Sequence, residues 1–274
     1  MPAIIIPQDA RPSYGLGFAR SAAESAYPNL WPGLESAWVP AFGQSGTRLY
    51  DVIGKYHGTF SGITAATGWV LNDHGPAILC NAISELVDCG DIHNVTDNFT
   101  IVADVVAGGA GYRTIAARRG TAGPQYQFYI RTTTDVLGAY TTGGVRDSSF
   151  ALVGGVRYGV SLSIASGGWI FGCNGQTEAV ASQTCTTKAV SFSIGNNTGT
   201  QDNTPFDGQI NAVLFYGRAL PAALHSRLTL DPIAPLRLRR RTIVMAAAAP
   251  STGQPTMRRW GGVPGMMLTG RVGW

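Results

Sequence analysis

Charged side chains are scarce in this chain. Asp, Glu, Lys and Arg make up 13% of its 274 residues, about half of the share usual in soluble domains. So few charges indicate either a surface that largely faces other proteins or a surface rich in Ser, Thr, Asn and Gln, and the sequence leaves both open. No stretch approaches the roughly 18 to 20 apolar residues of a membrane span, so we expect none.

Export signals are lacking as well. The first twelve residues, MPAIIIPQDARP, have neither the basic start nor the long apolar run of a signal peptide, so we expect no Sec export. In a cytoplasmic product the four cysteines, Cys80, Cys89, Cys173 and Cys185, would stay reduced, and their spacing fits no zinc pattern. Buried free thiols are therefore expected, with a Cys173–Cys185 bridge across a hairpin as the alternative.

Acidic residues are missing from the last 39 residues, Leu236 to Trp274, which hold seven arginines. The preceding residues carry a net charge of −3, so this tail alone brings the chain to +4. Arginine, tryptophan and methionine are typical of interface cores. We predict an arm that docks on a partner, with a solvated linker as the alternative. Its candidate docking residues are Arg237, Arg239, Arg240, Arg241, Arg258, Arg259, Trp260, Met266, Met267 and Trp274.

Nucleic acid is a less favoured partner for this arm. The arginine run could bind phosphates, but no aromatic residue is interleaved with it, and the body offers no matching positive patch.

Alternating apolar residues predict an all-β fold. In Asn98–Ala107, one face holds Phe99, Ile101, Ala103 and Val105, as in a sandwich strand. Asn174-Gly175 is a strong hairpin signal. Strands separated by Gly-rich turns predict a two-sheet antiparallel sandwich or jelly roll. The expected strands are Leu34–Pro40, Asn98–Ala107, Tyr112–Arg118, Gln125–Arg131, Val156–Ala165, Trp169–Cys173, Ser191–Ile194 and Gln209–Tyr216.

One short helix is expected near the end of the sandwich. Leu220, Leu224 and Leu228 share one face, Pro221 suits the first turn, and Asp231-Pro232 ends it. The expected organisation is an irregular N-terminal arm over residues 1–32, one sandwich domain over residues 33–231, and the basic arm over residues 232–274. Deleting residues 236–274 should leave the sandwich folded.

Four segments carry motifs of a known family. Gly33–Phe60 combines Trp-x-Pro, a Gly-rich loop, an Asp and a His-Gly-Thr turn, and later come Phe99-Thr100-Ile101, Trp169–Gly175 and Phe206–Leu220. In this order they resemble the opening and the later strands of laminin-G-like, concanavalin A-type jelly rolls, and the likeness covers roughly residues 33 to 231. Acids that family members often carry are mostly missing from Cys80–Leu86, which weakens any inherited metal or saccharide site there.

This variety of jelly roll, with its two arms, is similar to proteins of tailed bacteriophages. The resemblance implies a virion component, such as a capsid decoration, head-fibre or minor tail protein, assembled in the host cytoplasm. Its expected partner is the major capsid protein or another virion protein. Closed symmetry favours a homo-oligomer, and a trimer is our expectation at a capsid site.

Catalytic motifs are lacking, and we predict no enzymatic activity. A retaining glycosidase needs two carboxylates about 5 Å apart, but the four glutamates, Glu24, Glu35, Glu85 and Glu178, form no such motif. Gly-x-Ser-x-Gly and the phosphate-binding loop are missing too. A structural or solvated role is expected for His57, His74, His93 and His225.

Glycan binding is the alternative function, as an adhesion module for host-surface glycans. Its aromatic candidates are Trp69, Tyr112, Tyr126, Tyr140 and Trp169, although each is more often a core residue in a sandwich. No cofactor is expected. Asp202, Asn203 and Asp207 could offer oxygen ligands to calcium, and an Asx-rich turn is the interpretation we favour for them.

Overall fold

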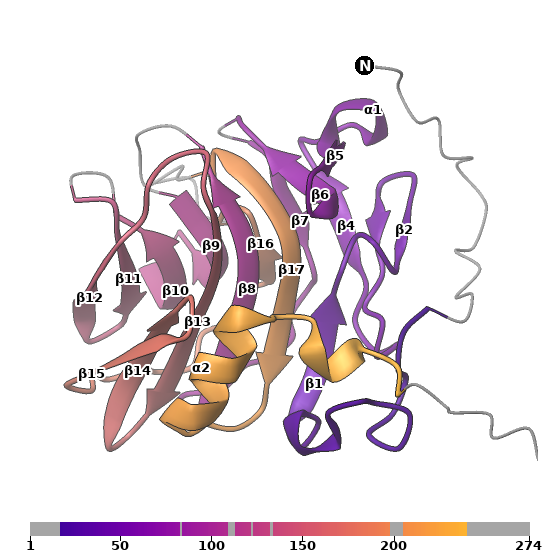
Figure 1. Ribbon diagram of the computed structural model, residues 1–274. Coiled ribbons are helices and arrows are strands. Elements are labelled where there is room, and N and C mark those ends of the chain that lie inside the picture. Colours follow the sequence, from indigo (N-terminus) through magenta and orange to yellow (C-terminus); the bar gives the residue numbers. More distant parts are fainter. Residues whose placement is uncertain are drawn as a thin grey trace, which may run out of the picture. The chain divides into compact units, whose positions relative to one another are not determined.

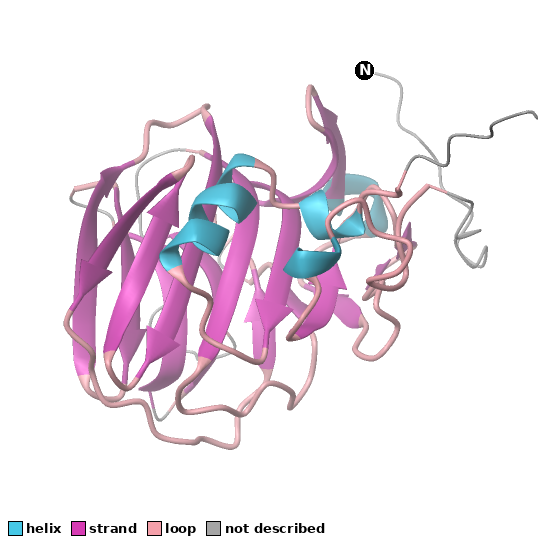
Figure 2. Cartoon of the chain, turned by 60° about the horizontal axis from the view of Figure 1, so that its bottom comes forward, coloured by secondary structure: helices cyan, strands magenta, loops and turns pink. Residues whose placement is uncertain are grey.

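The computed structural model describes residues 17–239 except 83, 109–112, 122, 132–133 and 198–204. Over this range the chain forms two antiparallel sheets packed face to face, an all-β jelly-roll-like sandwich as predicted (Figures 1 and 2).

The first sheet has eight strands among the described residues. Helix α2 (Ala222–Leu230) lies on its outer face (Figures 1 and 2). In spatial order its strands are β15 (Gln176–Val180), β14 (Gly168–Cys173), β13 (Arg157–Ala165), β8 (Phe99–Ala107), β17 (Gly208–Tyr216), β6 (Gly75–Cys80) and β5 (Trp69–Asn72), while β1 (Leu34–Trp38) pairs with β17.

The second sheet has nine strands among the described residues. Their spatial order is β12 (Gly144–Ala151), β11 (Val136–Thr141), β10 (Gly123–Ile130), β9 (Arg113–Gly120), β16 (Phe192–Ile194), β7 (Leu86–Asp88), β4 (Gly58–Ser61), β3 (Arg48–Leu49) and β2 (Gln44–Ser45). Short helical turns complete the described chain: η1 (Pro28–Leu30), α1 (Ala65–Gly68) and η2 (Ala234–Leu236).

The eight expected strands are all present, within two residues at each described end. The hairpin at Asn174-Gly175 is confirmed, because both residues have positive φ, 43° and 88°. Strands β2 to β7, β11, β12 and β15 were not expected. Most of them are too short or too mixed in polarity to show an alternating pattern.

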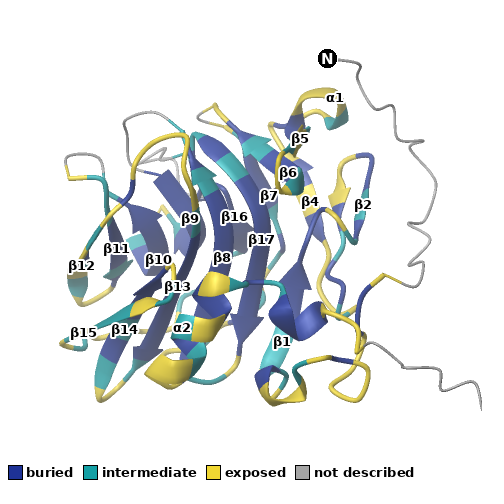
Figure 3. Ribbon diagram, in the orientation of Figure 1, coloured by how far each residue is buried: buried dark blue, intermediate teal, exposed yellow. Residues whose placement is uncertain are grey.

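The main core lies between the sheets. Phe99, Ile101, Ala103 and Val105 of β8 point into it, as the alternation predicts. In Figure 3, β8 and β17 are almost wholly buried. Both faces of β8 are buried because α2 covers the other one, which is why Val102 joins a second cluster with Leu214 and Leu228.

Helix α2 is attached to β13 by a buried polar contact. Ser161 Oγ lies 2.6 Å from His225 Nδ1, and both residues are fully buried. Burial lowers the pKa of His225 to about 4, so this imidazole is neutral in the folded protein at neutral pH.

A second polar contact in the interior is centred on Arg118 of β9, which has no exposed surface. Its guanidinium donates to Gln125 Oε1 at 2.9 Å, to Asp91 Oδ1 and Lys188 O at 2.7 Å each, and to Ile92 O. One buried cation therefore holds the segments before β8 and before β16 against the second sheet.

No helix in the described part of the chain has the length and apolarity that crossing a bilayer requires.

Replacing Arg118 with leucine should destabilise the fold strongly, because three carbonyl oxygens and the Asp91 carboxylate would lose their donor. A buried carbonyl oxygen left without a donor costs about 1 to 3 kcal/mol. Urea unfolding followed by tryptophan fluorescence would measure the loss. The matched control is R48L at exposed Arg48, which should change the free energy of unfolding by less than about 0.5 kcal/mol. Equal, small losses in both variants would contradict this role of Arg118.

The free energy of unfolding should fall as the pH drops from 6.5 towards 4. His225, with a folded pKa of about 4, and His93, with one of about 3, stay neutral while the unfolded chain takes up protons near pH 6.5. Each such histidine contributes a slope of about 1.4 kcal/mol per pH unit. Chemical denaturation between about pH 6 and pH 4.5 would show this slope, and H225Q should reduce it by about the share of one histidine, about 1.4 kcal/mol per pH unit. An unchanged slope in H225Q would contradict the contribution of a neutral, buried His225 to this pH dependence.

Candidate functional site

The two terminal segments meet in a structure that we call the terminal clasp, formed by residues 17–32 and 232–239. Ser25 and Leu238 form an antiparallel bridge. Backbone hydrogen bonds run from Ala19 N to Leu236 O at 2.7 Å, from Ala26 N to Arg237 O at 2.8 Å, and from Arg239 N to Glu24 O at 2.7 Å. The two ends of the described chain are thus held side by side.

Apolar burial fixes the clasp on the outer face of the first sheet. Phe18, Leu30, Ala234 and Leu236 are buried in the second cluster, together with residues of β1, β17 and α2. The carbonyl oxygen of Pro235 accepts hydrogen bonds from Ser25 Oγ and Trp31 Nε1, each at 2.7 Å. The clasp is therefore an integral part of the folded unit.

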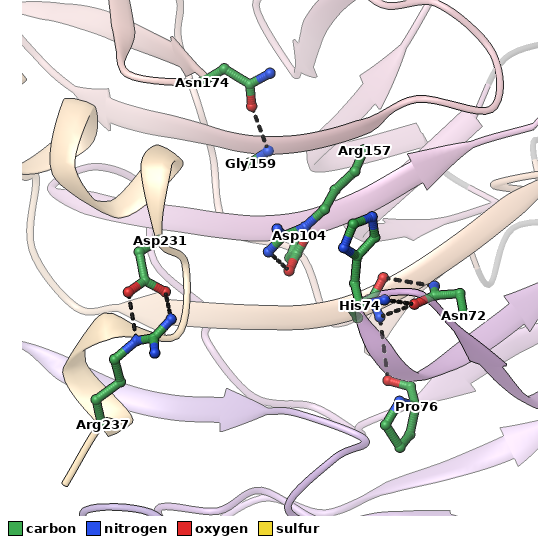
Figure 4. A network of polar contacts seen from close by, with 10 residues as sticks. Asn72, His74, Pro76, Asp104, Arg157, Gly159, Asn174, Asp231 and Arg237 are labelled. Atoms are coloured by element: carbon green, nitrogen blue, oxygen red, sulfur yellow. Dashed lines mark hydrogen bonds and ion pairs between the residues drawn. The ribbon is translucent and has the colours of Figure 1, made fainter.

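A row of polar contacts continues from the clasp across the outer face of the first sheet (Figure 4). Arg237 pairs through two nitrogens with Asp231, at 2.6 and 3.1 Å. Arg157 pairs in the same way with Asp104, at 2.7 Å for both bonds. Hydrogen bonding to the aspartates raises the pKa of both arginines. The Arg237 side chain is 55% exposed, so its pair with Asp231 orients the chain more than it stabilises it. The Asp104 carboxylate is buried, so Arg157 supplies the charge partner that this buried group requires.

The row ends in an amide cluster at the β5–β6 hairpin. Asn72 Nδ2 donates to Gln209 Oε1 at 2.6 Å and to Asn211 Oδ1 at 3.2 Å. The side-chain oxygen Oδ1 of Asn72 accepts from the backbone N–H of His74 at 2.8 Å (Figure 4). These partly buried amides satisfy one another, so the cluster locks the hairpin onto β17.

The clasp changes the expected domain boundaries. Residues 17–32 and 232–239 pack on the sandwich instead of extending from it. The expected deletion from residue 236 would remove the fully buried Leu236. Arg237 and Arg239 belong to the clasp. The other predicted docking residues lie outside the described residues: Arg240, Arg241, Arg258, Arg259, Trp260, Met266, Met267 and Trp274.

Two of the five aromatic residues predicted to bind glycans are not exposed. Tyr126 and Trp169 are fully buried in the main core, because the alternation of β10 and β14 turns them inward; as exposed platform residues they were wrong. The Trp169 indole N–H has no partner among the described residues.

The other three aromatic candidates for glycan binding are Trp69, Tyr140 and Tyr112. Trp69 is half-buried and donates to Gly46 O at 2.7 Å. Tyr140 is half-buried too, with Arg119 5.3 Å from its ring centre. Tyr112 lies outside the described residues.

Calcium binding stays a prediction. Asp202 and Asn203 lie outside the described residues, and the Asp207 carbonyl accepts a hydrogen bond from Gly108 N at 2.6 Å. In the described part of the chain, no three His, Cys, Asp or Glu side chains gather as metal ligands would.

Ser36, His93 and Glu35 lie in an order that resembles a nucleophile–base–acid triad, which sequence patterns did not reveal. Ser36 Oγ is 3.1 Å from His93 Nε2, and His93 Nδ1 is 3.5 Å from Glu35 Oε2. However, Ser36 is fully buried, and the imidazole stacks on Phe215 with ring centres 3.7 Å apart. Burial lowers the pKa of His93 to about 3. This histidine is a packed core residue, and the lack of enzymatic activity remains a prediction.

His57 also has a structural role, in the turn after Asp51. The buried Asp51 carboxylate accepts N–H bonds from Ala37, Ile53, Lys55 and Tyr56 at 2.9 to 3.2 Å. His57 Nδ1 accepts from the backbone of Asp51 at 3.2 Å. The Asp and the His-Gly-Thr turn noted in the sequence thus form one hydrogen-bonded loop.

All four cysteines are free and buried, as expected for reduced thiols. Burial raises the pKa of Cys80 and Cys185 to about 12 and that of Cys173 to about 11. The alternative Cys173–Cys185 bridge is not formed.

A cleft of about 400 Å³ opens at the rim of the sandwich, which we call the rim cleft. It lies where the segment before β8, the β13–β14 turn and the segment between β15 and β16 meet. Its lining residues are Thr96, Asp97, Ile164, Ala165, Ser166, Ser182, Gln183, Thr184 and Cys185.

No family model matches the sequence, and no curated protein matches it. Among solved structures, the Trypanosoma rangeli sialidase in complex with sialic acid has a TM-score of 0.56 and 15% identity over 73% of this chain and 33% of its own. A mutant of the same sialidase displaying trans-sialidase activity has a TM-score of 0.57 and 15% identity over 74% and 33%.

Domain 4 of AbnA, a GH43 extracellular arabinanase from Geobacillus stearothermophilus, in complex with arabinotriose, has a TM-score of 0.48 and 15% identity over 71% of this chain and 87% of its own. The chain spans about a third of the length of the sialidases that it matches. The likeness to the sialidases is one of fold, a two-sheet β-sandwich shared at low sequence identity.

Proposed function

We propose that this protein is a non-enzymatic structural component of a tailed-phage virion, held on the particle by its terminal arms. The observation that carries the proposal is the terminal clasp, because it starts both arms from one place on the sandwich. A partner surface that engages one arm is then within reach of the other, which raises the effective concentration of the second contact.

The composition of the tail supports docking on an acidic protein. Residues 240–274 hold five arginines and no acid, and the bidentate geometry of arginine suits carboxylates. Trp260, Met266, Met267 and Trp274 would supply the apolar contacts. The major capsid protein or another virion protein is the proposed partner, and a trimer remains the proposed oligomer.

Glycan recognition is the second candidate function. Tyr126 and Trp169 cannot take part in it, because both are buried in the core. The rim cleft favours glycan recognition, since residues with hydroxyl, amide and carboxylate groups line that cleft. A glycan array with no signal above background would count against this role.

Truncation after Arg239 should leave the fold intact and abolish attachment, because it removes the tail and keeps the clasp. The truncated and full-length proteins would be mixed with purified virions that lack the protein, sedimented, and quantified by mass spectrometry. Unchanged thermal unfolding would show that the sandwich survives. If the truncated protein still saturates the particles, anchoring by the tail is refuted.

Two variants of the full chain separate the contributions of charge and apolar contact. Replacing Arg240, Arg241, Arg258 and Arg259 with glutamine should weaken attachment most at low salt, since exposed charges are screened as ionic strength rises. Replacing Trp260 and Trp274 with alanine should weaken attachment at every salt concentration. A matched control is R48Q, which removes an exposed positive charge outside the tail.

A further inference from the structure

We propose that the rim cleft binds one neutral sugar unit of a glycan through Asp97 and the hydroxyl groups around it. The inference rests on the second candidate function, glycan recognition, and is independent of anchoring by the arms. It moves the binding site from the aromatic residues to the rim of the sandwich.

Asp97 gives the cleft its charge. It is the charged side chain among the described lining residues, and it forms no salt bridge within the described chain. Its carboxylate accepts from Asn98 Nδ2 at 3.1 Å and is half-exposed, so acceptor positions remain for a ligand. A carboxylate can accept two neighbouring hydroxyl groups at once. It would repel the carboxylate of an acidic sugar.

The remaining lining groups match a polyhydroxylated ring. Thr96, Ser166, Ser182 and Thr184 bring hydroxyl groups. The Gln183 amide is engaged within the protein, because its nitrogen donates to Gly143 O at 2.8 Å and its oxygen accepts from the Arg146 guanidinium. Ala165 provides a small apolar area, suited to the C–H face of a sugar, whereas Ile164 is buried in the main core. A volume of about 400 Å³ lies within the range of roughly 300 to 1,000 Å³ typical of small-molecule sites.

One wall of the cleft is held in place before any ligand arrives. Thr184 O accepts from Thr141 Oγ1 at 2.7 Å, Gly143 N at 2.8 Å and Thr142 Oγ1 at 3.1 Å. Cys185 Sγ lies 3.2 Å from Gln125 O. A rigid wall reduces the entropy lost on binding.

The nearby cation does not reverse the charge of the cleft. Arg146 Nε donates to Ala181 O at 3.3 Å, and its Nη1 donates to Val145 O at 3.1 Å and to the side-chain oxygen of Gln183 at 2.9 Å. Its guanidinium is thus already bound by acceptors of the protein. Arg146 is not a lining residue. Recognition of neutral rather than acidic sugars therefore follows from Asp97.

The first experiment uses the full-length protein on an array of neutral and sialylated glycans, followed by NMR titration with the methyl glycoside of the best neutral terminal sugar. Amide resonances of Thr96, Asp97, Ala165, Ser166 and residues 182–185 should shift together and saturate. An array without hits refutes glycan recognition itself. Binding with shifts confined to another region refutes only the rim cleft, and a preference for sialylated glycans refutes the neutral ligand.

Variants then test the role of Asp97. D97A should weaken binding about tenfold, the loss expected for a charge-assisted hydrogen bond, and S166A by less. D73A, at an exposed carboxylate in the β5–β6 turn, is the matched control and should bind as the wild type does. A fingerprint ¹H–¹⁵N spectrum confirms the fold of each variant. Equal affinity of D97A and wild type would overturn the proposal.

Discussion

The fully buried guanidinium of Arg118 is the constraint on which the end of the sandwich with the rim cleft depends. A charge without solvent contact must be matched by acceptors, and here they come from Gln125, Asp91, Ile92 and Lys188. Three of these four partners lie in irregular segments of the chain. The segment that begins at Asp91 continues through His93, which stacks in the core, to Asp97 at the rim cleft. The hydrogen bonds that Arg118 requires therefore fix the path of the segment from Asp91 to Asp97, which brings Asp97 to the rim cleft.

The terminal clasp shows a second consequence of burial. The outer face of β8 and β17 is too apolar to face water, since Val102, Leu214 and Tyr216 lie on it. Helix α2 covers part of this face, and the terminal segments cover more of it with Phe18, Leu30 and Leu236. Residues 17–32 and 232–239, which the sequence suggested as parts of free arms, thus become a cover for the first sheet.

Polar groups were harder to assign from the sequence than apolar ones. The alternation of β8 predicted both the strand and its inward face, because burial of one face imposes a period of two. The interaction of Ser36 with His93, or of Arg118 with Lys188, leaves no such pattern, since each joins positions far apart in the chain. The same holds for the rim cleft, whose three segments meet only through the folding of both sheets. Tyr126 and Trp169 were wrongly predicted to bind glycans because residue type alone does not indicate which face of a strand a side chain occupies. The alternating pattern of the strand around each residue does indicate that face.

The sequence by itself determined that this chain is an all-β sandwich with one short helix after Pro221, and that its positive charge is concentrated in the last 39 residues. Local periodicity and composition suffice for those conclusions, because they depend on neighbours in the chain. Only the tertiary structure decided that residues 17–32 and 232–239 form a clasp, that every cysteine is a free buried thiol, and that Asp97 lies in a hydroxyl-lined cleft. These features depend on contacts between distant segments, whose free energy is decided when both sheets pack together.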